Sequence, residues 1–228
     1  MTPTKRASAK QQPAKGTPST RPAHKPGRAA WLFLLMVVAI GTAIDLASKT
    51  IAFNTLAEAP VAIDREAVVG ATELQALIPR HEPTTIIPRV LELQLVLNPG
   101  AVFGIGAGKR VFFIVATTAA IGFALFMFAK WTGRRDRVAH AAIGLVIAGG
   151  LGNLYDRVRF ACVRDFLHPL PGMEYPFGIS TPWSGREVWP YVSNLADLWL
   201  IIGVAILVVF LWRGPRDGVP AREPDTAE

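Results

Sequence analysis

The chain has 228 residues, of which 51% are hydrophobic and 18% are charged, whereas average soluble domains carry roughly 25% charged residues. This composition excludes an ordinary soluble enzyme and indicates a membrane protein. The single cysteine, Cys162, excludes an internal disulfide framework and a metal site built of several cysteines. The net charge of +7 does not indicate nucleic-acid binding, because seven of the 24 Lys and Arg lie in the first 28 residues and most others flank apolar segments.

The amino-terminal part of the chain divides into a polar tail and an apolar stretch. Residues 1–28 are rich in Pro, Ala, Ser, Thr and basic residues, which predicts a disordered tail. The stretch 31–53 is long enough to cross about 30 Å of hydrocarbon. A cleaved signal peptide is the alternative interpretation, since basic residues precede the apolar stretch. We favour a membrane span, because the stretch exceeds the roughly 7–15 apolar residues of a signal peptide.

Three more apolar stretches are predicted to span the membrane, at 111–131, 138–156 and 191–212. Basic residues in the tail, between the second and third spans and after the fourth predict that both termini are cytoplasmic. The connections 54–110 and 157–190 then face outward. The second holds five prolines and is predicted to be irregular and to lie at the lipid interface.

The predicted fold class is therefore an all-α membrane protein of four helices, with a small extracytoplasmic β element in the first outer loop. That β element is LELQLVLN at 91–98, where apolar and polar residues alternate before the stretch becomes wholly apolar. We expect residues 29–213 to form one membrane domain and residues 214–228 to form a cytoplasmic tail.

Polar residues that are far apart in the sequence map to the outer half of the predicted bundle. Asp45 lies about 21 Å beyond Trp31 along the first span, at 1.5 Å per residue. Burying an ionisable side chain among membrane helices costs roughly 2.5–3.5 kcal/mol, so convergence of several indicates a functional site. Taken singly, such residues are more often interface anchors or helix caps. The other members of the set are Asn98, Asp156, Asp165, Asn194 and Asp197.

Two aspartates that share a partly desolvated site would hold one proton between them and could activate a water molecule. Other catalytic classes lack their residues: the four histidines form no H-E-x-x-H motif, and no G-x-S-x-G motif occurs. GIGAGKR at 104–110 does not satisfy the phosphate-loop pattern, and its glycines predict a turn. Cys162 is interpreted as a packing residue. Four glycines are interpreted as sites of close helix packing: Gly144, Gly149, Gly150 and Gly152.

Four sequence blocks resemble the successive signatures of lipoprotein signal peptidases, the signal peptidase II enzymes of bacteria. They are DLASK (45–49), NPGAVFGI (98–105), GGLGNLYDRVRFACVRDF (149–166) and NLADLWLIIG (194–203). Their order and their spacing relative to the four spans match, and the resemblance covers roughly residues 31–212. It implies a membrane aspartic endopeptidase that removes the signal peptide of a prolipoprotein by cutting just before a cysteine that carries diacylglycerol.

The resemblance also implies where and with what the protein acts. Its expected partners are diacylglyceryl-prolipoprotein substrates and membrane lipid, without nucleic acid, and we expect a monomer that needs no metal or organic cofactor. The expected location is the bacterial inner membrane, with the active site near the outer face.

The resemblance implies that Asp165 and Asp197 are the catalytic pair. Arg157 matches a site residue that either holds the substrate backbone or orders the site through Asp156. All the matched positions with a supporting or substrate-binding role are Asp45, Lys49, Asn98, Gly100, Asn153, Asp156, Arg157, Asn194 and Ala196.

The chain departs from the family pattern at Pro99 for the usual Thr, Ser193 for Phe and Leu198 for Ser. The 32-residue step from Asp165 to Asp197 and the 54–110 connection are both longer than usual.

A different class of function is also considered, namely a non-catalytic four-span transporter or scaffold that binds a lipid headgroup or an ion. The nearly uncharged inner halves of the spans favour the peptidase. An inactive family member is a further alternative, which the complete set of aspartates disfavours.

Overall fold

The computed structural model describes residues 25–100, 110–182 and 184–212. Within this part, four helices are long and apolar enough to cross a membrane: α1 (Arg28–Thr55), α3 (Arg110–Trp131), α4 (Arg137–Phe160) and α5 (Leu195–Trp212). The prediction of four such helices is confirmed. α4 continues four residues past the predicted end of its span, and α5 begins four residues after the predicted start. Residues 1–24 of the predicted tail, 104–109 of the predicted glycine turn and the tail 214–228 lie outside the described residues.

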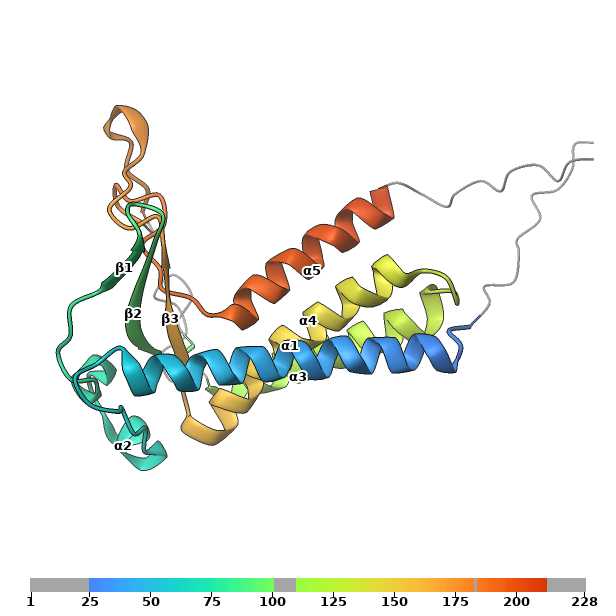
Figure 1. Cartoon of the computed structure of the whole chain (residues 1–228), viewed down its shortest axis with the longest axis horizontal. Helices are drawn as coiled ribbons and strands as arrows, with labels where there is room; N and C mark the ends of the chain where they lie inside the picture. The colour runs from blue at the N-terminus through green and yellow to red at the C-terminus, as the bar shows by residue number, and fades with distance from the viewer. Residues whose placement is uncertain (1–24, 101–109, 183, 213–228) are drawn as a thin grey trace, which may run out of the picture.

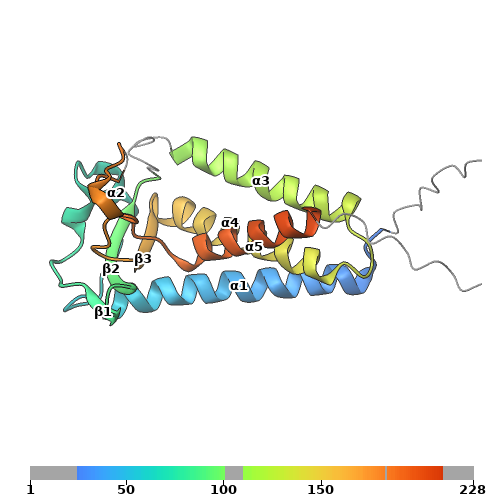
Figure 2. The same cartoon turned by 90° about the horizontal axis from the view of Figure 1, so that it is seen from above.

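α4 is the central helix and packs against α1, α3 and α5 (Figures 1 and 2). Glycines on its surface allow the close approach, as the sequence predicted. A Cβ atom added at Gly149 would collide with the carbonyl oxygen of Ala196, and one added at Gly152 would collide with the carboxylate of Asp45. Both contacts lie next to the polar residues that the sequence places at the outer end of the bundle. The absence of a side chain at these glycines therefore allows the polar side chains of α1, α4 and α5 to come close to one another.

The two ends of the bundle are different. The ends of the described chain and the link between α3 and α4 lie at one end of the bundle, and the sheet and the short helix α2 (Arg65–Gly70) lie at the other (Figures 1 and 2). Two short 3-10 helices, Leu74–Leu77 and Pro176–Gly178, also lie in the long connections. Such short helices carry little periodic signal, and the sequence did not predict them.

The sheet has three antiparallel strands in the order β1 (Thr84–Ile87), β2 (Leu91–Asn98) and β3 (Val163–Pro169). The predicted strand at 91–98 is confirmed as β2. The prediction that the connection 157–190 is irregular is wrong for residues 163–169, which form β3. Within residues 163–169 the only proline is Pro169, at the end of the strand, and pairing with β2 satisfies the backbone groups of this segment.

An apolar core lies between the sheet and the end of α1. Its buried members include Phe53 of α1, Leu95 and Leu97 of β2, and Phe166 of β3. Cys162 is fully buried in the same core, and this burial raises the pKa of its thiol to about 12. The thiol therefore stays protonated, which agrees with its interpretation as a packing residue.

Candidate active site

Asp165 and Asp197 come from different elements but belong to one hydrogen-bonded cluster. Asp165 lies on β3, and Asp197 lies in the first turn of α5. Between them, Ser193 pairs with Leu167: the Ser193 N–H donates to the Leu167 carbonyl at 2.7 Å, and the Leu167 N–H donates back at 2.8 Å. This bridge fixes the start of α5 beside β3. The enlarged segment between the two aspartates is therefore looped out without separating them.

The side chain of Asp165 accepts hydrogen bonds from two amides. Asn98 Nδ2 donates to its Oδ2 at 3.0 Å, and Asn194 Nδ2 donates to its Oδ1 at 2.5 Å. Asn98 is placed by the sheet, because Asp165 pairs with Val96 in the register of β2 and β3 and Asn98 is its diagonal neighbour on the same face. Asp165 is only 1% exposed, whereas Asp197 is half-buried.

Asp197 is held by the capping arrangement at the start of α5. Asn194 is the residue before the helix, and its Oδ1 accepts the Asp197 N–H at 3.1 Å. In return, the Asn194 N–H donates to Asp197 Oδ2 at 3.3 Å. This reciprocal pair is a capping box, which satisfies two backbone donors at a helix start. The same residues thus begin the helix and orient the two carboxyl groups.

Asn153 of α4 connects Lys49 of α1 with Asn194 and Asp197 at the start of α5. Its Nδ2 donates to Asp197 Oδ1 at 2.8 Å, and its Oδ1 accepts from Asn194 Nδ2 at 3.1 Å and from Lys49 Nζ at 3.0 Å. Because an ammonium group can only donate, Lys49 fixes which end of the Asn153 amide is the oxygen. The N–H groups of Gly100 and Asp197 fix the amides of Asn98 and Asn194 in the same way. All three amides therefore have one possible orientation.

Lys49 and Asp45 lie one turn apart on α1 and are both fully buried. Lys49 Nζ lies 2.8 Å from Asp45 Oδ2 and 3.5 Å from Asp156 Oδ2. The other oxygen of Asp45 accepts the backbone N–H of Ala196 at 2.8 Å. An unpaired ion at this depth would be strongly destabilising, so the pairing is required for these charges to be buried at all.

Asp156 is paired with Arg164, which the sequence analysis did not include among the site residues. Arg164 Nη2 lies 2.9 Å from Asp156 Oδ1, and the Arg164 backbone N–H donates to Asp156 Oδ2 at 3.1 Å. Alternation along β3 points Arg164 to one face and Asp165 to the other. The sequence VRDFLHP does not alternate between apolar and polar residues, so no local signal marked Arg164 as a partner of Asp156.

Arg157 does not form an ion pair with Asp156 within the described residues. Its guanidinium lies over the ring of Phe113, 5.3 Å from the ring centre, and donates to the carbonyl of Asn153 at 3.4 Å. Its buried Nε has no acceptor among the residues that the structure describes. Of the two roles considered for Arg157, ordering of the site through Asp156 is taken by Arg164.

Gly100 supports the site through its backbone. Its φ angle is +96°, a conformation that glycine adopts readily and other residues rarely do. The Gly100 N–H donates to Asn98 Oδ1 at 2.8 Å, and a Cβ atom at this position would press on the Phe113 ring. All eleven residues selected from the sequence are thus in or next to this cluster.

The charges of the cluster favour one protonated carboxyl group. Three cations and four carboxyl groups lie together, so the set is neutral when one carboxyl holds a proton; they are Lys49, Arg157, Arg164, Asp45, Asp156, Asp165 and Asp197. Burial, followed by the negative charge of Asp197, raises the pKa of Asp165 to about 7. Asp165 therefore holds a proton below about pH 7.

The described part of the chain contains no group of three or more His, Cys, Asp or Glu placed to hold a metal ion. The expectation that no metal or cofactor is needed stays a prediction. The arrangement provides one buried carboxyl group with a raised pKa, Asp165, beside one half-buried carboxyl group, Asp197. Such a pair can supply an acid and a base to the same bond.

Comparison with known proteins assigns the chain to a family. The family model described as signal peptidase (SPase) II matches residues 37–213. The chain belongs to the signal peptidase II family. The resemblance carried by the four sequence blocks is thereby confirmed.

Curated relatives of the signal peptidase II family agree with this membership. The chain is similar to a lipoprotein signal peptidase of Halothermothrix orenii, with 38% identity over 60% of this chain and 81% of the relative. It is also similar to a lipoprotein signal peptidase of Syntrophotalea carbinolica, with 35% identity over 61% of this chain and 77% of the relative.

Solved structures support the fold. A bacterial membrane enzyme determined by the in meso method at 2.3 Å resolution has a TM-score of 0.58 and 21% identity, covering 87% of this chain and 99% of that one. A second such structure, at 1.9 Å, has a TM-score of 0.57 and 22% identity, over 85% of this chain and 99% of that one. At these identities the likeness concerns the fold alone.

Proposed function

We propose that this signal peptidase II family member is an aspartic endopeptidase that removes the signal peptide from diacylglyceryl-modified prolipoproteins, cutting just before the lipidated cysteine. The observation that carries the proposal is the pairing of a buried carboxyl, Asp165, with a half-exposed one, Asp197, through shared amide donors. This arrangement supports their assignment as the catalytic residues.

In the proposed reaction, the ionised Asp197 takes a proton from a water molecule as the water oxygen attacks the scissile carbonyl carbon. Asp165 gives its proton to the carbonyl oxygen, which becomes a hydroxyl. When the tetrahedral intermediate collapses, that hydroxyl returns its proton to Asp165, and the proton on Asp197 goes to the leaving amine. The peptide C–N bond breaks, and both carboxyl groups regain their starting states. The free donor of Arg157 is suited to hold the substrate backbone.

We further propose that both termini are cytoplasmic and that the sheet end of the bundle faces outward. The end that holds the described termini is rich in basic residues, as the positive-inside rule requires of a cytoplasmic end; they include Arg28, Lys130, Arg134, Arg135 and Arg137. A lipid-anchored substrate then enters sideways from the bilayer. Because one chain supplies both carboxyl groups, we propose that it acts as a monomer.

The test is cleavage of a diacylglyceryl-modified prolipoprotein by the purified full-length protein. We expect Asp165→Asn and Asp197→Asn each to lower kcat by at least about a thousandfold, since each removes one half of an acid–base pair. Asp136→Asn is the matched control, because Asp136 lies in the α3–α4 link at the opposite end of the bundle. Full turnover by either variant would contradict the assignment. A transporter or scaffold would give no product even in the unmodified protein.

A further inference from the structure

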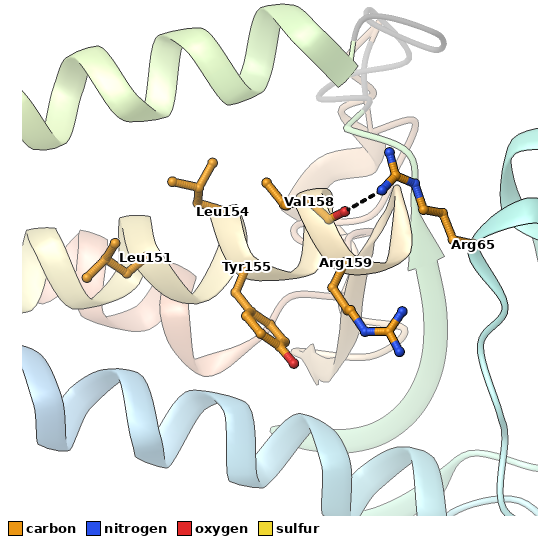
Figure 3. Close-up of a pocket in the computed structure, with 6 residues that line it drawn as sticks. All are labelled: Arg65, Leu151, Leu154, Tyr155, Val158 and Arg159. Atoms are coloured by element: carbon orange, nitrogen blue, oxygen red, sulfur yellow. Dashed lines mark hydrogen bonds between the residues drawn. The ribbon is translucent and has the colours of Figure 1, made fainter.

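A groove of about 550 Å³ lies on α4 beside α2 (Figure 3). Its volume falls within the roughly 300–1,000 Å³ of typical ligand sites. At about 100° per residue, its lining residues on α4 lie on the side of the helix opposite to Asn153 and Asp156. The groove is therefore separate from the candidate active site. Its lining residues are Arg65, Leu151, Leu154, Tyr155, Val158 and Arg159.

The two ends of the groove have different chemistry. Figure 3 shows the guanidinium groups of Arg65 and Arg159 toward the end of α4, with Leu154 and Leu151 further back along the helix. Val158 and Leu151 are separated by about 10 Å along the helix axis, at 1.5 Å per residue. The groove thus has a cationic mouth at the sheet end of the bundle and an apolar floor that extends toward the middle of the membrane span.

The two guanidinium groups at the mouth keep donors for a ligand. Arg65 donates to the carbonyl of Val158 at 3.1 Å, and Arg159 lies over the ring of Phe160, 5.4 Å from its centre. Neither is in an ion pair with a carboxylate of the described residues. Arg65 has two acidic neighbours in sequence: Asp64 accepts the Ala67 N–H at the start of α2, and Glu66 is exposed and in no ion pair of the described residues. Two uncompensated cations beside an apolar channel fit an anion that carries a hydrocarbon chain.

We propose that this groove binds one anionic phospholipid of the outer leaflet. Its phosphate contacts Arg65 and Arg159, and one acyl chain lies along Leu154 and Leu151. Guanidinium groups bind phosphate with two parallel hydrogen bonds, and the apolar floor adds a contact that a free phosphate ion would not use. In this placement the headgroup lies at the sheet end of the bundle, which we propose faces outward, and the acyl chain extends from there toward the middle of the membrane. The inference thus depends on the proposed outward orientation and is independent of the peptidase chemistry.

The experiment is native mass spectrometry of the full-length protein, purified in detergent and titrated with phosphatidylglycerol or phosphatidylcholine of identical acyl chains. Each basic residue near the membrane surface is expected to raise the affinity for an anionic lipid about fivefold, so the two together should raise it about 30-fold. We therefore expect R65Q/R159Q to bind phosphatidylglycerol about 30-fold more weakly than the unmodified protein. The control is R80Q/R89Q, which removes the same charge from two exposed arginines of the 54–110 connection, which also contains Arg65. It should bind phosphatidylglycerol as the unmodified protein does.

Either of two results would overturn the proposal. One is equal binding of phosphatidylglycerol by R65Q/R159Q and R80Q/R89Q. That result would show that Arg65 and Arg159 act only through the general surface charge and do not form a specific site. The other is equal binding of phosphatidylcholine and phosphatidylglycerol by the unmodified protein, which would make the groove an ordinary lipid contact. If loss of the Arg65–Val158 bond unfolds the double variant, Arg159→Gln alone tests the same point with an expected fivefold loss. Peptidase activity enters none of these measurements.

Discussion

Lys49 of α1 donates a hydrogen bond to Asn153 of α4, with 3.0 Å between Nζ and Oδ1. Through this one bond, a fully buried ammonium group sets the orientation of the amide that contacts Asp197 directly and reaches Asp165 through Asn194. Lys49, which the sequence analysis placed among the supporting residues, therefore helps to position both carboxyl groups through Asn153.

Replacing Lys49 with Met is expected to destabilise the protein by about 3–5 kcal/mol, because the carboxylate of Asp45 would be left buried without its cation. The activity should fall as well, since the Asn153 amide would be free to flip. Thermal unfolding in detergent and cleavage assays measure the two effects. Lys130→Met is the control, because Lys130 is exposed near the end of α3 and should tolerate the change.

A second variant separates charge from shape. In K49M/D45N the uncompensated carboxylate is gone, so we expect part of the lost stability to return, and the two substitutions to be non-additive. Strictly additive effects would show that Lys49 and Asp45 do not depend on each other.

Gly149→Ala tests the close approach of α4 and α5. The added Cβ atom would collide with the backbone carbonyl of Ala196, which cannot rotate away, so the two helices must separate. We expect a loss of about 1–3 kcal/mol, the usual range for overpacking, and lower activity because Asn153 and Asp197 would move apart. The measurements are the thermal midpoint and kcat.

The matched control for Gly149 is Gly122→Ala on α3, where an added Cβ atom would meet nothing within 4 Å. Alanine favours the helix over glycine by roughly 0.5–1 kcal/mol, so this variant should be neutral or slightly more stable. Equal effects of the two substitutions would show that α4 and α5 do not require a glycine at their contact.

The pH dependence of activity should reflect the proton on Asp165. Its pKa is raised to about 7 by burial and by the charge of Asp197, and the proposed acid must be protonated. We therefore expect kcat/KM to fall above about pH 7, by tenfold per unit at the limit. A profile that stays flat to pH 9 would show that Asp165 is not the acid.

The same shift predicts how stability depends on pH. The pKa of Asp165 is higher in the folded protein than the roughly 3.9 of an unfolded chain. Its contribution to stability is therefore full below about pH 4 and is lost as the pH rises to about 7. Thermal midpoints measured from pH 4 to pH 8 should show this decline in the unmodified protein, and Asp165→Asn should remove that component.

Asn194→Ser tests whether the amide positions Asp165 or only begins α5. Serine is a good capping residue, so the helix start should be retained. The donor to Asp165 Oδ1 is lost, however, and that hydrogen bond lowers the pKa of Asp165. We expect reduced activity together with a shift of the alkaline limb to higher pH. Ser193→Ala is the control, because the pairing of Ser193 with Leu167 is formed mainly by the backbone. An unchanged alkaline limb in Asn194→Ser would limit Asn194 to a capping role.

The outline of the site was predictable because it depends on local patterns. Long apolar stretches have few structures available in a membrane, so the four helices followed from length and composition. Their alternating direction then placed Asp45, Asp156 and Asp197 at one end. The strand at 91–98 followed from its alternation. β3 did not, because it depends on pairing with β2, which local sequence does not specify.

The sequence by itself determined that polar residues gather at one end of four membrane helices, since burial of charge in lipid leaves few alternatives. Only the tertiary structure decided which groups bind each other: Arg164 in place of Arg157 as the partner of Asp156, and Lys49 as the donor that orients Asn153. Several contacts of the cluster join residues that are distant in sequence, such as Lys49 and Asn153 across 104 residues and Ala196 and Asp45 across 151 residues. They depend on helix separation and strand register, which are properties of packing rather than of any short stretch of sequence.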